Sequence, residues 1–255
     1  MTTPALQVMK AVKASGIITT VVNAAFPDAV NPMLKGIGIS PDLGIGNVSN
    51  ICQPIREAVA RLLMVDIKTV KVSMAAHHFV GNTIPSVGHP KGAPYHLCIK
   101  YNDDDISQDV LPHKKIFGFI KSELKRKRGK EGMFMTASSA VRIIEGFFND
   151  EIVNAHSPGI RGLIGGYPVV IGRQSFDVKL EGGITLADAI AINEAGQRYD
   201  GIDSINDGYI SFKQESIDVM NALMGFNHSG YNISDVAEVS AELVQRYQDL
   251  RAKHA

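Results

Sequence analysis

Helix and strand patterns alternate over the first 80 residues, and this alternation constrains the fold more than any other feature of the sequence. PALQVMKAVKASG has apolar residues at helical spacing and ends at a glycine, and the β-branched, almost continuously apolar IITTVVN (17–23) follows it. Further helix and strand patterns continue the alternation at 27–38, 43–46, 49–64 and 69–79. Because this order is typical of parallel sheets covered by helices, we expect residues 1–80 to form the end of a parallel, Rossmann-like sheet.

A different pattern follows the Gly- and Pro-rich segment VGNTIPSVGHPKGAP (80–94), which we expect to be a loop. YPVVIGR and SFDVKL (167–180) are typical of antiparallel strands, and DGIDSINDG (200–208) is typical of turns. Helix patterns occur at 112–128, 135–148, 186–198, 214–225 and 234–252. We therefore predict an α/β plus α+β protein with a boundary near residue 80. Residues 1–80 would be a remnant of a dinucleotide-binding sheet, and residues 81–255 a mixed or antiparallel catalytic, substrate-binding and oligomerisation domain.

Charge and cysteine content count against several classes of protein. The 26 basic and 26 acidic residues balance, and the basic run KSELKRKRGK (121–130) is typical of a solvated helix end, so we expect no nucleic-acid partner. No run of about 18 apolar residues occurs, so we expect no membrane span. Cys52 and Cys98 lie in apolar surroundings without metal-ligand spacing. This indicates buried free thiols, no metal site and a cytoplasmic protein.

Two segments, VVNAAFPDAVNPML and GIGNVSNICQPIREAVARLLMVDIKTVKVSMAAHHFVGNTIP, together resemble the middle of the lactate/malate dehydrogenase superfamily. This superfamily includes the NAD-dependent family 4 glycoside hydrolases. The resemblance implies that the strand nearest the nicotinamide ends at Asn23 and that Asn47 or Asn50 occupies the next strand-to-helix turn. It also implies that Arg56 is the arginine of the following helix and that His78 is the catalytic histidine at the end of a strand. GLIGGYPVVIGRQSFDVKL would belong to the antiparallel sheet of the catalytic domain.

The resemblance assigns a chemical role to each of these side chains. His78 would exchange a proton with the substrate, and Arg56 would hold an anionic group of the substrate. Asn23 and Asn47 would position the nicotinamide and the substrate through their amides. The alternative for the histidine is a structural role, for the arginine a solvated helix face, and for the asparagines a cap at a strand end.

Three further residues complete the set of candidates. Asn50 and Arg161 are possible substrate contacts, Arg161 because the catalytic domain of this superfamily also contributes to the substrate site. On an extended strand, His77 and its neighbour would point to opposite faces. We therefore expect His77 to be a packing residue and only the second histidine to enter the site.

The sequence departs from both branches of this superfamily. The dehydrogenases place an aspartate in the helix to orient the histidine, whereas this chain has asparagine, which cannot stabilise an imidazolium as a carboxylate does. The family 4 hydrolases have a metal-binding cysteine where this chain has Gly46, and their Asn-His pair is His77–His78 here. The first predicted function is therefore that of an NAD(P)-dependent oxidoreductase acting on a small hydroxy or oxo substrate. A family 4 hydrolase relative is the third prediction, after the non-enzymatic subunit described below.

No G-x-G-x-x-G sequence follows any of the predicted strands. We therefore expect NAD or NADP binding to require a missing N-terminal half, and we expect self-association or a partner chain that supplies this half. The second alternative is a non-enzymatic subunit that keeps the fold and uses the exposed sheet edge and the helix at 234–252 as an interface. Neither the substrate nor the choice between NAD and NADP follows from the sequence.

Overall fold

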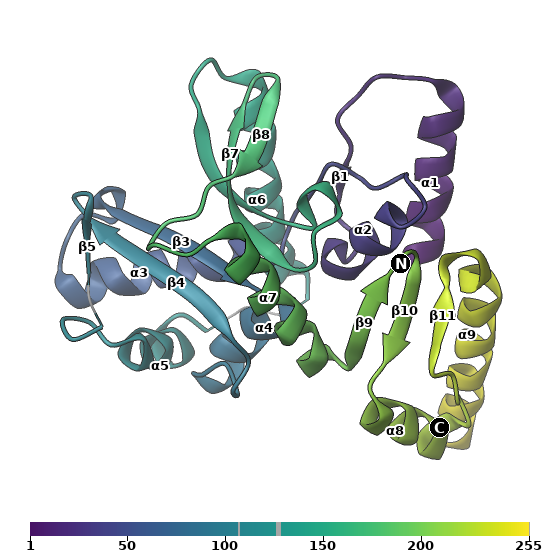
Figure 1. Cartoon of the computed structure of the whole chain (residues 1–255). Helices are drawn as coiled ribbons and strands as arrows, with labels where there is room; N and C mark the ends of the chain where they lie inside the picture. The colour runs from purple at the N-terminus through teal and green to yellow at the C-terminus, as the bar shows by residue number, and fades with distance from the viewer. Residues whose placement is uncertain (107, 126–128, 255) are drawn as a thin grey trace.

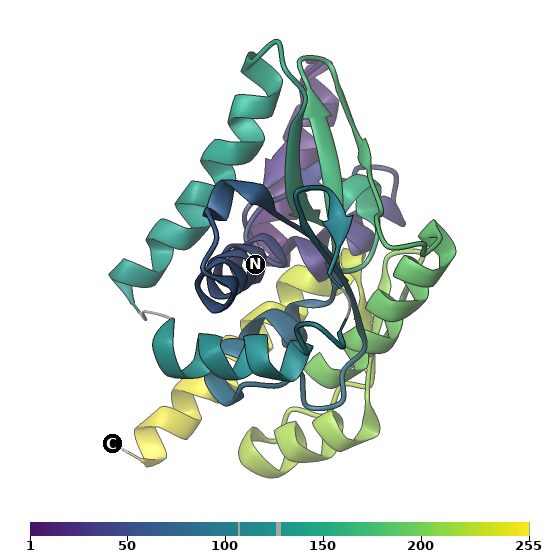
Figure 2. The ribbon, with the colours of Figure 1, turned by 90° about the vertical axis from the view of Figure 1, so that its left-hand side faces the viewer.

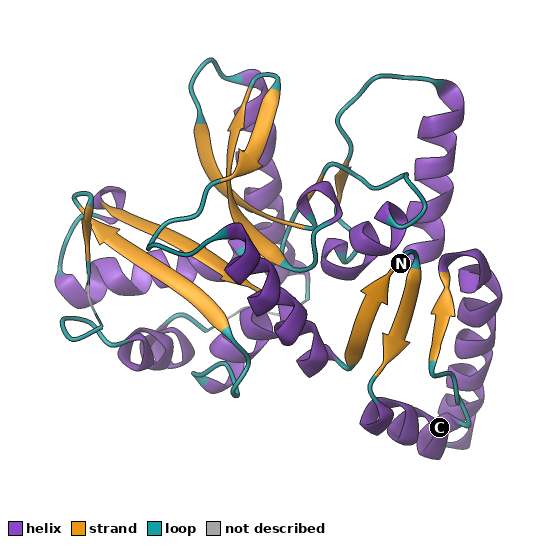
Figure 3. Ribbon diagram, viewed as in Figure 1, coloured by secondary structure: helices purple, strands orange, loops and turns teal. Residues whose placement is uncertain are grey.

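The structure is a computed structural model that describes residues 1–106, 108–125 and 129–254. It is a mixed α/β protein with one large antiparallel sheet, a smaller antiparallel sheet and a short parallel strand pair (Figure 1). Figure 3 distinguishes its helices and strands by colour. The predicted antiparallel sheet in the second part of the chain is confirmed.

The large sheet has the strand order β5-β4-β3-β7-β6, and β8 also pairs with β7. Its strands are β3 (Val70–Ala76), β4 (Tyr95–Tyr101), β5 (Asp104–Asp105), β6 (Val153–Pro158), β7 (Gly166–Gly172) and β8 (Ser175–Val178). Among the described residues, β3 meets β7 at a single residue pair, Ala76 with Gly166. Since β6 occupies one edge of β7, β3 and β8 must share the other edge. The sheet is therefore joined at Ala76 and forks from there towards Val70, with β3 and β4 on one branch and β6, β7 and β8 on the other.

Helices cover both branches of the fork. α3 (Ser49–Leu63) and α5 (His113–Glu123) pack with β3 and β4 in one apolar cluster, and α6 (Lys130–Phe148) packs on β6 and β7. α7 (Leu186–Gln197) contacts β3 and β4 and lies between the large sheet and the smaller one (Figure 1). The predicted helix at 49–64 is confirmed, because Ile51, Ile55 and Val59 are buried on its inner face.

The smaller sheet contains β9 (Ile202–Asn206), β10 (Tyr209–Phe212) and β11 (Gly230–Asn232). It shares an apolar cluster with α1 (Thr2–Ser15) and α2 (Pro27–Lys35). α8 (Gln214–Met224) and α9 (Val236–Lys253) pack together beside it. The prediction of turns at 200–208 was wrong for its centre, because buried Ile202 and Ile205 form a strand there.

The prediction of a parallel sheet over residues 1–80 is confirmed only in part. Among the described residues, only β1 (Val22–Asn23) and β2 (Leu43–Gly44) pair in parallel. Ile17 and Ile18 are exposed, so the apolar character of 17–23 does not reflect a buried strand. β3 pairs antiparallel with β4 along its whole length, from Val70 with Tyr101 to Ala76 with Tyr95.

The segment 80–94, predicted to be a loop, begins as a helix. α4 spans His78–Val87, and Val80, Thr83 and Ile84 are buried at helical spacing on its inner face. The predicted boundary near residue 80 falls within this helix, and β3 before it pairs with β4 after it. Whether the two parts fold separately stays a prediction.

The remaining predictions concern the middle of the chain and its surface. The helix expected at 112–128 ends at Glu123, and residues 126–128 of the basic run lie outside the described residues. Cys52 and Cys98 are buried free thiols, as predicted. Within the described ranges, no helix is long and apolar enough to cross a membrane.

Candidate functional site

The candidate site lies where β3 ends and α4 begins. His77 has an extended backbone and precedes the first residue of the helix, His78. Because the strand ends at Ala76, the two side chains do not alternate as they would on an extended strand. Both imidazoles instead contact one carboxylate, that of Asp200. The Nδ1 atom of His78 lies 3.0 Å from Asp200 Oδ2, and the Nδ1 atom of His77 lies 3.4 Å from the same oxygen.

Asp200 reaches the histidines because α7 is fixed against the large sheet. The buried amide of Asn193 accepts a hydrogen bond from Gly166 N–H and donates one to Gly166 C=O, each at 3.2 Å. One turn later, Gly196 lies so close to His77 that a Cβ atom there would be 2.5 Å from the histidine Cβ. A 3-10 turn, η3 (Arg198–Asp200), follows α7 directly and places its last residue beside the histidines.

A second carboxylate, Asp28, lies in the buried part of this site. It accepts a hydrogen bond from the Asn47 amide, which also donates to Ala76 O at 3.4 Å. Burial raises the pKa of Asp28, although the nearby His77 and His78 act in the opposite direction. Among the described residues, Asp28 Oδ2 and both ring nitrogens of His77 are buried without a hydrogen bond. The interior of the site is therefore polar and incompletely hydrogen bonded.

His78 is partly accessible, since 34% of its side chain is exposed against 0% for His77. The edge of its ring meets Phe26 with centroids 5.0 Å apart, and Asn82 Nδ2 lies 2.9 Å from its Nε2. An ionised carboxylate only accepts hydrogen bonds, so the contact with Asp200 fixes a proton on Nδ1 of His78. The neutral ring then carries its lone pair on Nε2, which is the arrangement that a general base needs.

The ionisation of Asp200 should contribute to stability. Burial opposes it, but the contacts with His77 and His78 lower the pKa of Asp200 from 3.8 to about 2. A depressed pKa gives stability that is present above about pH 4 and is lost as the pH falls towards 2. Asp200→Asn should therefore reduce the free energy of unfolding at pH 7 by about 2 kcal/mol, and the deficit should shrink over this pH range.

This prediction is checked by urea unfolding of the parent and the variant between pH 2 and pH 7. Asp109→Asn, at an exposed position, is the matched control and should show no such pH-dependent deficit. A deficit for Asp200→Asn that stays constant from pH 7 to pH 2 would contradict an ion pair at this position.

The two predicted cofactor contacts are already engaged within the chain. Asn23 is buried, and its amide nitrogen donates to Asn31 Oδ1 at 2.8 Å and to Ala25 O at 3.4 Å. Asn47 uses its amide nitrogen in the same way, on Asp28 and Ala76. Both hydrogens of each amide therefore have acceptors. Whether these residues contact a cofactor stays a prediction.

The other predicted site residues lie apart from His78. Arg56 donates through Nε to Ile67 O, in the turn after α3, at 2.9 Å. Asn50 donates to Thr136 Oγ1 of α6 at 3.1 Å. Arg161 contacts Asp177 and Phe176 of β8. The structure thus brings together His78 and Asn47, which both lie near Asp28, while Asn23 ends β1 in a separate strand pair. The functional roles of these residues stay predictions.

Two acidic residues of the site were not among the candidates from the sequence. Asp200 lies 122 residues from His78 and was assigned to a turn, so no local pattern connects the two. Asp28 follows Pro27 at the start of α2, where an acidic residue is expected for the helix dipole alone. Only the fold brings these carboxylates to the histidines.

No model of a known protein family matches the chain, and no curated protein matches it either. Among solved structures, it is similar to the 6-phospho-beta glucosidase from Thermotoga maritima in a monoclinic form, with a TM-score of 0.45 and 12% identity over 91% of this chain and 66% of that chain. A tetragonal form of that enzyme with manganese, NAD+ and glucose-6-phosphate gives a TM-score of 0.45 and 11% identity, over 91% and 67%. The chain thus spans about two thirds of that enzyme. A likeness at this level carries no functional role over to this chain.

Proposed function

We propose that the chain is part of an NAD(P)-dependent, dehydrogenase-like oxidoreductase that acts on a small hydroxy or oxo substrate. His78 is the acid–base residue of this proposal. The observation that carries it is the 3.0 Å contact between His78 Nδ1 and Asp200 Oδ2 at the end of a buried strand. A carboxylate on one ring nitrogen orients the imidazole and stabilises its protonated form.

The proton transfer involves His78 Nε2. This atom takes the proton of the substrate hydroxyl in the direction of oxidation and returns it in the direction of reduction, while Asp200 stabilises the imidazolium. Asn82 Nδ2 lies 2.9 Å from Nε2, so the substrate hydroxyl would replace this contact. Asp200 supplies the carboxylate that the resemblance places in the helix after the strand-to-helix turn, where this chain has asparagine.

The nucleotide would be bound by residues outside this chain, in a partner or in a further segment. In support, the amides of Asn23 and Asn47 are engaged within the chain. Titration of NADH and NADPH by cofactor fluorescence tests this, first with the chain alone and then with any partner that copurifies. The chain has no tryptophan, so energy transfer from tryptophan cannot contribute to the signal. Binding that requires the partner is the expected result. Binding by the chain alone would refute the proposal of an external nucleotide site.

The second candidate function is that of a non-enzymatic subunit, and α6 carries the observation that favours it. Phe134, Val141 and Phe148 are exposed at intervals of seven residues along this helix, so they lie near one face. Figure 2 shows α6 along one edge of the molecule. Absence of NADH and NADPH binding with and without a partner would favour this candidate. A monomer at all concentrations in sedimentation would count against association in either case.

The third candidate, a family 4 glycoside hydrolase relative, would require manganese-dependent cleavage of a phosphorylated nitrophenyl glycoside. Gly46 stands where that family has its metal-binding cysteine. We therefore expect no cleavage in this assay.

A further inference from the structure

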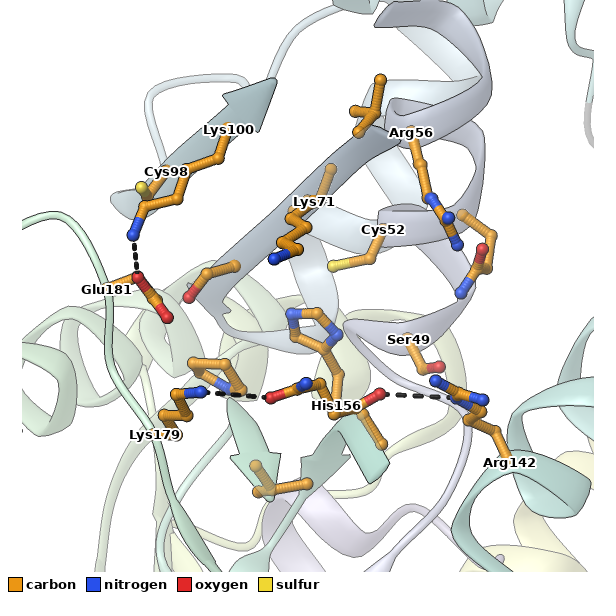
Figure 4. A pocket seen from close by; sticks show the side chains of 18 of the residues that line it. Ser49, Cys52, Arg56, Lys71, Cys98, Lys100, Arg142, His156, Lys179 and Glu181 are labelled. Carbon is orange, nitrogen blue, oxygen red and sulfur yellow. Dashed lines mark hydrogen bonds and ion pairs between the residues drawn. The ribbon is translucent and has the colours of Figure 1, made fainter. Parts of the chain in front are cut away.

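A cavity of about 380 Å³ lies inside the fork of the large sheet, next to α3. β3 and β4 form one wall, and β6 and β7 form another. Figure 4 shows the side chains that converge on it, with Cys52, Arg56, Lys71, Arg142 and His156 among them. The volume is within the range of small-molecule sites. None of the residues of the His78 site lines this cavity, so the inference below does not depend on the proposed function.

The lining is strongly cationic. Six basic side chains face two carboxylates around the cavity. Lys71 pairs with Asp103, and Lys100 pairs with Glu181, so both carboxylates are already engaged. Arg56, Lys68, Arg142 and Lys179 are the remaining cations.

Within the described part of the chain, none of these four cations makes an ion pair shorter than 3.9 Å. Arg56 donates through Nε to the Ile67 carbonyl and forms no ion pair there. Lys179 donates to Asn154 Oδ1 at 3.4 Å, and Arg142 donates through Nε to Asn154 O at 3.4 Å. Among the described residues, the carboxylate that Arg142 contacts is Glu145, at 3.9 Å. Burial and the neighbouring Arg142 guanidinium lower the pKa of Arg56, and Asp66 acts in the opposite direction. The two guanidinium groups therefore repel each other, and an anion bound between them would offset this repulsion.

The inner wall of the cavity carries a buried hydroxyl without a partner. Ser73 is 92% buried, and its Oγ has no hydrogen bond among the described residues. His156, also buried, accepts a hydrogen bond on Nε2 from Met74 N–H at 3.1 Å. Burial lowers the pKa of His156 to about 4, so at neutral pH the ring is neutral and carries its proton on Nδ1. The inner wall thus adds neutral hydrogen-bond donors to the cations at its rim.

We propose that this cavity binds a small polyanion through phosphate or carboxylate oxygens. Arg56, Arg142 and Lys179 supply the positive charge, and the Ser73 hydroxyl donates a hydrogen bond to the bound anion. Guanidinium groups suit such a ligand because their planar donor set matches two oxygens of a phosphate or carboxylate group. The bound anion would also offset the repulsion between the two arginines and accept the hydrogen bond of the Ser73 hydroxyl.

Isothermal titration calorimetry with sodium pyrophosphate tests this proposal, using the full chain at low ionic strength. We expect one pyrophosphate per chain. The double variant Arg56→Gln/Lys179→Gln should weaken binding about 100-fold. Lys10→Gln/Lys13→Gln removes the same charge from the exposed surface of α1 and should leave the affinity unchanged. Ser73→Ala changes no charge and should weaken binding about tenfold through the lost hydrogen bond.

A second titration, with tricarballylate, distinguishes phosphate-bearing ligands from polycarboxylates. Tighter binding of pyrophosphate than of tricarballylate assigns the site to phosphate-bearing ligands, and the reverse order assigns it to polycarboxylates. Either order supports the proposal if the Ser73→Ala variant binds more weakly than the parent. This variant tests the site even if the double variant does not fold. Absence of pyrophosphate and tricarballylate binding at millimolar concentration would overturn the proposal. Equal weakening by the α1 control would also overturn it, because the binding would then reflect net charge alone.

Discussion

Replacing His78 with alanine should lower kcat about 10³-fold if this residue is the acid–base group, because the variant has no group at Nε2 to carry the proton. This corresponds to about 4 kcal/mol in the activation free energy. The measurement is NAD(P)H-coupled turnover of small 2-hydroxy and 2-oxo acids, made with the partner that supplies nucleotide binding. Asp200→Asn should cause a large part of the same loss, since His78 would keep its position but lose its carboxylate.

The matched control for this prediction is His89→Ala. His89 lies on the exposed segment after α4, where its Nδ1 accepts a hydrogen bond from Lys91 N at 3.1 Å. This variant should keep its turnover. If His78→Ala also kept its turnover, the catalytic role assigned to His78 would be wrong.

Replacing Asn193 with leucine should cause the largest loss of stability that we predict. Its side chain serves both the N–H and the C=O of Gly166, and all three groups are buried. Leucine would remove both of these hydrogen bonds from buried backbone groups, at a cost of about 1–3 kcal/mol each, so we expect a loss of roughly 2–6 kcal/mol in the free energy of unfolding. Urea unfolding at pH 7 measures this loss.

Asn221→Leu, at an exposed position of α8, gives the matched control. Its effect on the free energy of unfolding should be within about 0.5 kcal/mol. An equal effect of the two substitutions would show that Asn193 does not anchor α7. Because α7 leads into Asp200, partial unfolding of this anchor should also weaken the contact between Asp200 and His78.

Helices with a clear apolar face could be predicted from the sequence, but the pairing of strands could not. The helix at 49–64 was predicted from Ile51, Ile55 and Val59, and these residues are buried in the structure. The segment 17–23 has the composition of a buried strand, yet Ile17 and Ile18 are exposed. The composition of a segment indicates that its residues favour burial. Whether the segment forms a strand in a sheet depends on which other segment the fold places beside it.

The candidate site was predicted only in part, for a related reason. His78 could be proposed because it follows a strand, where ligands commonly bind in open α/β sheets. Asp200 could not, because it reaches the histidine only through the packing of Asn193 and Gly196 against the sheet. The cavity in the fork has the same origin, since its lining comes from separate segments between Ser49 and Glu181.

The protonation of His78 tests the central claim most directly, because it requires neither substrate nor partner. Two-bond ¹H–¹⁵N correlation spectra of the chain with ¹⁵N-labelled histidine distinguish the two neutral tautomers. Comparison with the spectrum of the His78→Gln variant identifies the signals of His78. With Asp200 accepting from Nδ1, the neutral ring should carry its proton on Nδ1 and should lose this preference in Asp200→Asn. A neutral His78 protonated on Nε2 in the parent chain, unchanged in Asp200→Asn, would contradict the acid–base pair.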